Sequence, residues 1–229
     1  MDKIIVIGSG ASGVHFALSV LRKGYPVTML DVGHPRLQVT NPRDSFNELK
    51  ANLSDAVQYY LGERYESIVF PGSSREYYTK PYAFPPNKNY IFSRPEDYNV
   101  EAKGFEPVFS FAQGGLAEAW TGGVYPLNDY ELKDFPFQYC DIEPYYDEVA
   151  KRIGISGAED DLAKFYPVHQ NLEDGLRFDQ NSQQLLARYE KQRGYLAGKL
   201  KSYLGRPRVA TLSRDRNGRK GCVYCGRCL

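Results

Sequence analysis

A glycine-rich hexapeptide near the N-terminus has the residue types and spacing of a phosphate-binding loop. It consists of Gly8, Ser9, Gly10, Ala11, Ser12 and Gly13. In such a GxGxxG pattern the first glycine allows a sharp turn, the second leaves space for a pyrophosphate, and the third allows a helix to pack closely on a strand. Asp31 ends the next apolar run, where a carboxylate can accept hydrogen bonds from the hydroxyls of an adenosine ribose. These residues indicate a site for an adenine dinucleotide, without choosing between NAD and FAD.

Positioning these groups requires a strand, a helix and a second strand. Residues 4–7 are apolar and predict the first strand. The helix is predicted by apolar residues at helical spacing, namely Val14, Ala17, Leu18 and Leu21. Gly24 ends this helix, and the following apolar run predicts a second strand that leads to Asp31. Because amides at a helix N-terminus attract phosphate, we expect the βαβ unit of a doubly wound, Rossmann-type α/β fold.

A second glycine motif places two glycine pairs on either side of the single tryptophan. Its candidate cofactor-binding residues are Gly114, Gly115, Trp120, Gly122, Gly123 and Val124. Glycine pairs remove Cβ atoms and let the backbone approach a flat or phosphorylated ligand. Taken alone, this motif is better explained as an ordinary glycine-rich turn beneath a core tryptophan.

The next segment favours a helix. Asp141 suits an N-cap, and Pro144 is tolerated in a first helical turn. The predicted apolar stripe consists of Ile142, Tyr145, Tyr146, Val149 and Ile153. We interpret its tyrosine pair as core packing rather than as a contact to substrate.

Together, the two glycine motifs and this aromatic, proline-containing segment resemble the glucose-methanol-choline (GMC) oxidoreductase family. The resemblance covers residues 1–33 and 113–155 and, more loosely, the C-terminal tail. It implies that residues 8–13 hold the pyrophosphate of FAD, that Asp31 replaces the usual glutamate on the adenosine ribose, and that residues 114–115 and 120–124 follow the cofactor towards its flavin ring. The chemistry it implies is oxidation of an alcohol or sugar CH–OH group by hydride transfer to flavin.

Two alanines depart from the family pattern. Ala117 stands where many members have a hydroxyl residue, which removes one side-chain hydrogen bond to FAD. Ala119 stands where some sugar-oxidising members have a histidine that carries FAD covalently. We therefore predict that FAD is bound noncovalently.

The sequence offers no recognisable catalytic base. Its three histidines are His15, His34 and His169, and none belongs to a pair of base and partner. The resemblance implies that the family's base follows much later in a longer chain. We therefore expect residues 1–229 to form an FAD-binding domain that lacks its C-terminal part and the substrate domain, with residues 34–113 as an insertion that wraps the cofactor. Such a chain is expected to need a missing C-terminal polypeptide and to be inactive alone.

Three cysteines, Cys222, Cys225 and Cys228, follow one another at the spacing that begins an iron-sulfur site, and zinc is a second alternative. Since the sequence shows neither a fourth ligand nor a second CxxC pair, we predict no metal site.

Composition narrows the class of protein. The 229 residues carry a formal net charge of +1, which gives no field that favours nucleic acid or an anionic membrane. No apolar run reaches the roughly 20 residues that span a bilayer, and the N-terminus lacks the basic start of a signal peptide. We expect a cytoplasmic flavoprotein whose partner is a small alcohol or sugar.

Two other functions are open at this point. An NAD(P)-binding reductase explains the first glycine motif but leaves the second without a role. A non-catalytic cofactor-binding fragment or subunit explains both motifs and the absence of a catalytic histidine.

Overall fold

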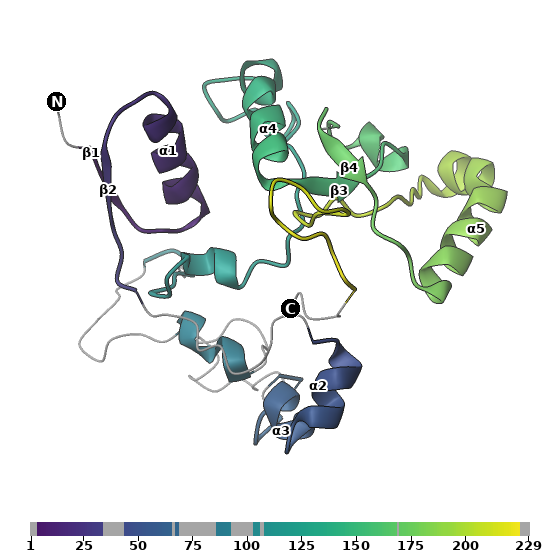
Figure 1. Cartoon of the computed structure of the whole chain (residues 1–229). Helices are drawn as coiled ribbons and strands as arrows, with labels where there is room; N and C mark the ends of the chain where they lie inside the picture. Colours follow the sequence, from purple (N-terminus) through teal and green to yellow (C-terminus); the bar gives the residue numbers. More distant parts are fainter. Residues whose placement is uncertain are drawn as a thin grey trace. The chain divides into compact units, whose positions relative to one another are not determined.

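The computed structural model of the chain describes residues 4–33, 44–65, 67–68, 86–92, 103–105, 108–168 and 170–224. These residues form two compact units, which divide between Thr121 and Gly122. Each unit contains one two-stranded parallel sheet together with helices, so the protein is of mixed α/β class (Figure 1). The single cofactor domain over residues 1–229 stays a prediction.

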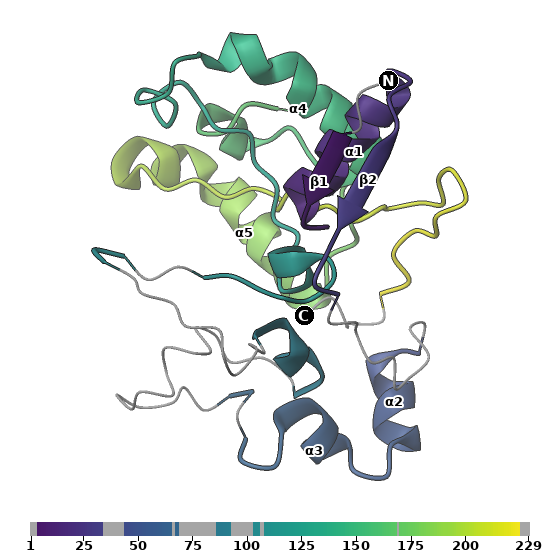
Figure 2. The same ribbon diagram turned by 90° about the vertical axis from the view of Figure 1, so that its left-hand side faces the viewer.

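Unit 1 begins with the predicted strand, helix and strand. These are β1 (Ile4–Ile7), α1 (Ala11–Arg22) and β2 (Val27–Leu30). The strands pair in parallel, from Ile4 opposite Val27 to Ile7 opposite Leu30, and α1 connects them (Figure 2). Gly24 terminates the helix with a φ of +84°, which a glycine adopts without steric cost. The described strands of this unit form this one pair, so the doubly wound sheet stays a prediction.

Short helices follow in unit 1. They are α2 (Phe46–Asn52), α3 (Ala56–Leu61), the 3₁₀ helix η2 (Pro86–Phe92) and the 3₁₀ helix η3 (Gly115–Glu118). A capping box begins α2, since the Glu48 amide donates to Ser45 Oγ at 3.2 Å and the Ser45 amide donates to Glu48 Oε2 at 2.6 Å. Three of these helices lie in the span 34–113, whose wrapping of a cofactor stays a prediction.

Unit 2 contains the second parallel pair. Its elements are α4 (Tyr139–Ile153), β3 (Ile155–Gly157), the 3₁₀ helix η4 (Asp161–Lys164), β4 (Leu172–Asp174), α5 (Gln180–Tyr195) and the π-helical turn η5 (Leu196–Leu200). Ile155 pairs with Leu172 and Gly157 with Asp174. All three residues of β3 are buried, and the core of this unit also holds Leu132, Ala150, Tyr189 and Leu212.

The start of α4 differs from the prediction. Gln138, not Asp141, is the N-cap, and Asp141 instead accepts a hydrogen bond from the Gln138 amide at 2.9 Å. Asp129 accepts from the Tyr139 amide at 2.8 Å, a contact from outside the helix that satisfies a donor of its first turn. Pro144 therefore lies inside the helix and beyond its first turn. Tyr145, predicted to pack in the core, is 66% exposed.

Residues 208–212 form isolated bridges rather than a regular strand. Val209 bridges to Gly123 and to Ser156. The segment is held in place by Arg208 instead of by a longer ladder of strand hydrogen bonds. The Arg208 side chain is fully buried and donates to the carbonyls of Pro167 and Tyr166. Burial lowers the pKa of Arg208.

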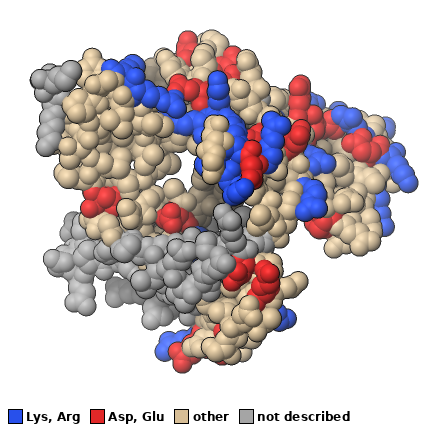
Figure 3. Space-filling model, in the orientation of Figure 1, with Lys and Arg blue, Asp and Glu red and all other residues tan. Residues whose placement is uncertain are grey.

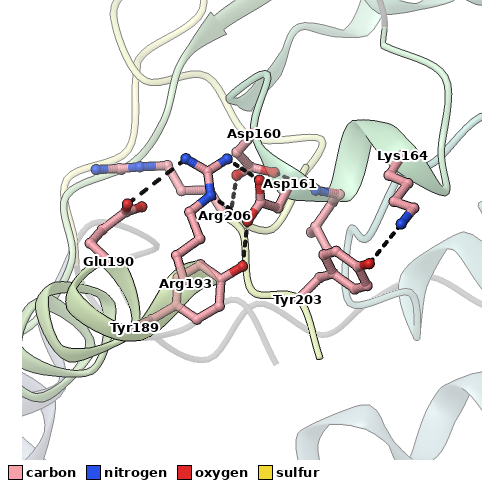
Figure 4. Close-up of polar contacts among 9 residues, drawn as sticks. Asp160, Asp161, Lys164, Tyr189, Glu190, Arg193, Tyr203 and Arg206 are labelled. Carbon is pink, nitrogen blue, oxygen red and sulfur yellow. Dashed lines mark hydrogen bonds and ion pairs between the residues drawn. The ribbon is translucent and has the colours of Figure 1, made fainter. Parts of the chain in front are cut away.

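Helix α5 begins at Gln180 and continues through Gly194, and its geometry changes at Leu196. Asp161 ties the helix to η4 by accepting from the Tyr189 hydroxyl and from the Arg193 guanidinium (Figure 4). Asp160, next in the same cluster, accepts from the Arg206 amide at 2.6 Å.

Acidic and basic side chains alternate over the part of the surface that unit 2 contributes to Figure 3. Unit 2 contains ion pairs of Arg152 with Glu148 and of Lys220 with Asp215. Among the helices that the structure describes, none has the length and apolarity needed to cross a bilayer.

Candidate functional site

Unit 1 contains a cavity of about 1020 Å³, at the ends of β1 and β2. Its wall is made of residues 7–13, 30–32, 108–112 and 115–117 together with Trp120. Both glycine motifs and the acidic residue after β2 therefore contribute to one hollow. Its volume is at the upper end of the range for small-molecule and cofactor sites.

The loop between β1 and α1 has the geometry that its glycines predict. Gly8 has a φ of +93°, and its amide donates to the Leu30 carbonyl at 2.8 Å. A Cβ on Gly13 would lie 2.2 Å from the Gly8 carbonyl oxygen, so only glycine allows the helix to start this close to the strand.

The N-terminus of α1 faces this cavity without a side-chain cap. Gly10 is the N-cap residue, it supplies no capping side chain, and the first turn contains no acidic residue. The first amides of a helix have no intrahelical acceptor, and the helix dipole places partial positive charge beside them. A phosphate group would accept hydrogen bonds from these amides and would be attracted by the partial positive charge.

Asp31 follows β2 directly and holds the loop by its backbone. Its two carboxylate oxygens accept from the Ser9 amide at 2.6 Å and from the Gly33 amide at 2.8 Å. Hydrogen bonds from the Ser9 side chain and backbone, with a smaller one from Gly33, lower the pKa of Asp31, so the carboxylate is ionised near neutral pH. A carboxylate has about four acceptor positions, and the three hydrogen bonds from Ser9 and Gly33 leave one for a ribose hydroxyl.

The two glycine motifs meet at Ser9. Its hydroxyl oxygen accepts a hydrogen bond from the Gly114 amide at 2.8 Å. A Cβ on Gly115 would lie 3.6 Å from the Gly10 Cα, and one on Gly10 would lie 3.8 Å from the Gly114 carbonyl oxygen. Glycines on both sides therefore allow the two backbones to approach closely.

The second motif is supported by residues that the sequence did not single out. Glu118 accepts from the Tyr90 hydroxyl at 2.6 Å through its side chain and from Lys88 Nζ at 2.7 Å through its carbonyl. Ser110 donates to the carbonyl of the buried Ile91 at 2.5 Å. These contacts join η2 to the cavity wall. Since they connect residues far apart in the chain, no local pattern could predict them.

An apolar surface forms the remaining wall of the cavity. Phe109 and Phe111 contact each other edge to face, with ring centroids 5.7 Å apart. Trp120 is 47% exposed and lies on the same wall. Aromatic side chains with accessible faces suit the flat rings of a dinucleotide.

The last three residues of the second motif do not line this cavity. Gly122, Gly123 and Val124 belong to unit 2, where Gly122 accepts from the Ala210 amide at 2.8 Å and the Val124 amide donates to the Arg208 carbonyl at 2.9 Å. Their predicted approach to a flavin stays a prediction.

The structure describes some of the histidines and cysteines of the chain. His15 lies in α1, whereas His34 and His169 lie outside the described residues. Cys140 and Cys222 carry free thiols, and Cys225 and Cys228 are also outside the described part. Within that part, no three His, Cys, Asp or Glu side chains are arranged to hold a metal ion.

Comparison with known proteins gives one distant relative. No family model matches the chain. The fructose dehydrogenase large subunit of Gluconobacter japonicus is 26% identical over 163 residues. The match covers 67% of this chain and 27% of that protein, so the chain corresponds to about a quarter of the relative's length. The relative's name describes a dehydrogenase and therefore an oxidoreductase.

Proposed function

We propose that this chain is the FAD-binding portion of an oxidoreductase of GMC type that oxidises an alcohol or sugar CH–OH group. The observation that carries the proposal is the convergence of both glycine motifs and Asp31 on one cavity. A distant relative named as a fructose dehydrogenase subunit supports the same class of reaction.

The cavity residues fit the parts of the proposed cofactor. The uncapped start of α1 offers amide donors to the pyrophosphate, and Gly10 leaves room for it. Asp31 keeps one acceptor position for a ribose hydroxyl. Gly115 would lie along the part of the cofactor between its two ring systems, with Gly114 held next to it by Ser9 and with Trp120 on the apolar wall.

The chemistry divides between cofactor and protein. Bound FAD would accept a hydride from the substrate. The described residues bind and orient the cofactor and line the cavity with apolar groups that exclude water. The noncovalent attachment predicted from Ala119 and the substrate itself belong to this proposal as well.

The single tryptophan makes the proposal directly testable. Trp120 is the single tryptophan of the chain and lies on the cavity wall, so its fluorescence responds to a flavin bound in that cavity. We expect FAD to quench it in a saturable titration at roughly micromolar concentrations. NAD and NADP, titrated in parallel at tenfold excess, should neither quench it nor displace FAD. A chain that binds NAD and ignores FAD would contradict the proposal.

The attachment is tested on the same sample. Acid precipitation of the FAD complex should release all yellow colour into the supernatant. Flavin that remains in the pellet would show that the noncovalent part of the proposal is wrong.

A further inference from the structure

We infer that Ser9 is a positioning residue that joins the two glycine motifs, so that its hydroxyl fixes the second motif over the phosphate loop and couples it to Asp31. The inference deepens the proposed function and rests on it for the identity of the ligand. Ser9 thereby has a role apart from contact with the cofactor, because its polar groups are engaged with protein.

The contacts of Ser9 connect three separate segments. Its amide donates to Asp31 Oδ2 at 2.6 Å, and its hydroxyl oxygen accepts from the Gly114 amide at 2.8 Å. An accepting hydroxyl keeps its own hydrogen for donation. The Ser9 side chain can donate it to Asp31, and a hydrogen bond from this side chain is the largest cause of the lowered pKa of Asp31. A continuous path of hydrogen bonds thus runs from the Gly114 amide through Ser9 to the carboxylate.

The second motif needs such a fixed point because of its own backbone. Gly114 and Gly115 have φ values of +93° and +60°. Glycine has more backbone freedom to lose than any other residue, and two in succession form a hinge. Glu118 holds the far side of this turn through Tyr90 and Lys88. Ser9 holds the side that faces the phosphate loop.

If Ser9 only stabilised the fold, its replacement would not selectively change the Gly114 amide or the Asp31 carboxylate. Ser19 provides the matched control, because its hydroxyl lies in α1 and donates within the helix to the His15 carbonyl at 2.9 Å. The variant Ser19→Ala removes the same atom from the same helical unit without touching the cavity.

The first measurement requires no cofactor. Amide hydrogen exchange of Gly114 is followed by NMR in the protein without added FAD. Ser9→Ala should accelerate it by about tenfold, since one hydrogen bond is lost, whereas Ser19→Ala and Ser9→Thr, which keeps a hydroxyl, should leave it close to that of the wild type. Unchanged Gly114 exchange in Ser9→Ala would overturn the inference.

The second measurement is FAD affinity, read from quenching of Trp120. Ser9→Ala should weaken binding by about tenfold, and Ser9→Thr should restore most of it. Equal affinity of Ser9→Ala and wild type would likewise overturn the inference. If the wild type binds no FAD while Gly114 exchange still depends on Ser9, the proposed function fails and the joining role of Ser9 stands.

A third readout is the pH at which FAD is released by acid. The groups that face Asp31 in the described chain are the Ser9 hydroxyl and the amides of Ser9 and Gly33, and none of them titrates; His34, next in sequence, lies outside that part. Loss of the Ser9 hydroxyl should raise the pKa of Asp31 towards its ordinary value, and acid release should then begin at a higher pH in Ser9→Ala than in Ser19→Ala. Identical release curves would argue against the coupling to Asp31.

Discussion

The two parallel strand pairs of this protein use an acidic residue in opposite ways. In unit 1, Asp31 follows β2 and remains exposed, with its oxygens bound to backbone amides. In unit 2, Glu173 lies within β4 and is buried, where Arg216 donates to it at 3.0 Å and the Ser213 amide donates at 3.1 Å. The Asp31 carboxylate faces a cavity, whereas the Glu173 carboxylate is enclosed by residues of unit 2.

The two carboxylates are kept charged by different surroundings. Burial acts to raise the pKa of Glu173, and hydrogen bonds from Arg216 and Ser213 outweigh it, so the net pKa is lowered and the group stays charged. The pKa of Asp31 is lowered by hydrogen bonds at the surface, and its carboxylate keeps one free acceptor position. A pair of parallel strands is therefore not enough for a ligand-binding site. Such a site also needs exposed hydrogen-bond donors and acceptors without protein partners at the carboxyl ends of the strands.

The largest effect is expected where the enclosed pair is broken. Arg216→Met leaves Glu173 buried with fewer donors and should lower the free energy of unfolding by about 3 kcal/mol or more. Lys220→Met is the control, because its pair with Asp215 is exposed. Urea unfolding followed by circular dichroism compares the two. Equal stability of both variants would show that Glu173 is not held as described.

At the open pair, the largest effect is expected from Gly13. Gly13→Ala places a Cβ against the Gly8 carbonyl, which forces the loop to move, and should weaken FAD binding by about 100-fold or more. Gly10→Ala adds a Cβ in ordinary contact and should keep the fold of the free protein, while the bulkier Gly10→Val should abolish binding without unfolding it. FAD titration and thermal unfolding of each variant test this. Wild-type affinity in Gly10→Val would contradict the phosphate-loop interpretation.

A smaller effect is expected from Asp31. Asp31→Asn exchanges one acceptor oxygen for a donor and should weaken FAD binding by about tenfold at pH 7. Because the pKa of Asp31 is lowered below its usual value of 3.8, the wild-type contribution should be complete above that pH and be lost as the pH falls through the lower value. FAD titrations of the wild type at pH 7 and pH 5 should therefore show no loss of affinity that is due to protonation of Asp31. If the affinity falls between pH 7 and pH 5 in both the wild type and Asp31→Asn, a group other than Asp31 causes the fall.

The smallest effect is expected on the surface of unit 2. Arg193→Ala removes the guanidinium from Asp161 at an exposed position, and should lower the Tm by no more than about 2 °C. Addition of 0.5 M salt should reduce even this difference, since salt screens exposed charges. A larger loss in a calorimetric scan would mean that the cluster in Figure 4 contributes more to unit 2 than exposed ion pairs usually do.

Sequence by itself determined the local parts of this protein. The glycines of residues 8–13, the helix after them, its end at Gly24 and the acidic residue after β2 were all predicted where the structure has them. Each depends on backbone conformation or on apolar periodicity within about thirty residues, and such information is contained in neighbouring residue types.

Tertiary structure alone decided how the parts are joined. The hydrogen bond from Gly114 to Ser9 spans 105 residues of sequence, and the contact of Tyr90 with Glu118 spans 28. Asp129, from outside the helix, accepts from an amide in the first turn of α4, and the buried Arg208 donates to the carbonyls of Pro167 and Tyr166. These contacts depend on which backbone groups meet in space, and a hydrogen bond leaves no periodic pattern in the chain that forms it. For that reason the first glycine motif and Asp31 could be named from sequence, whereas the cavity wall of residues 108–112 and the connections between the motifs could not.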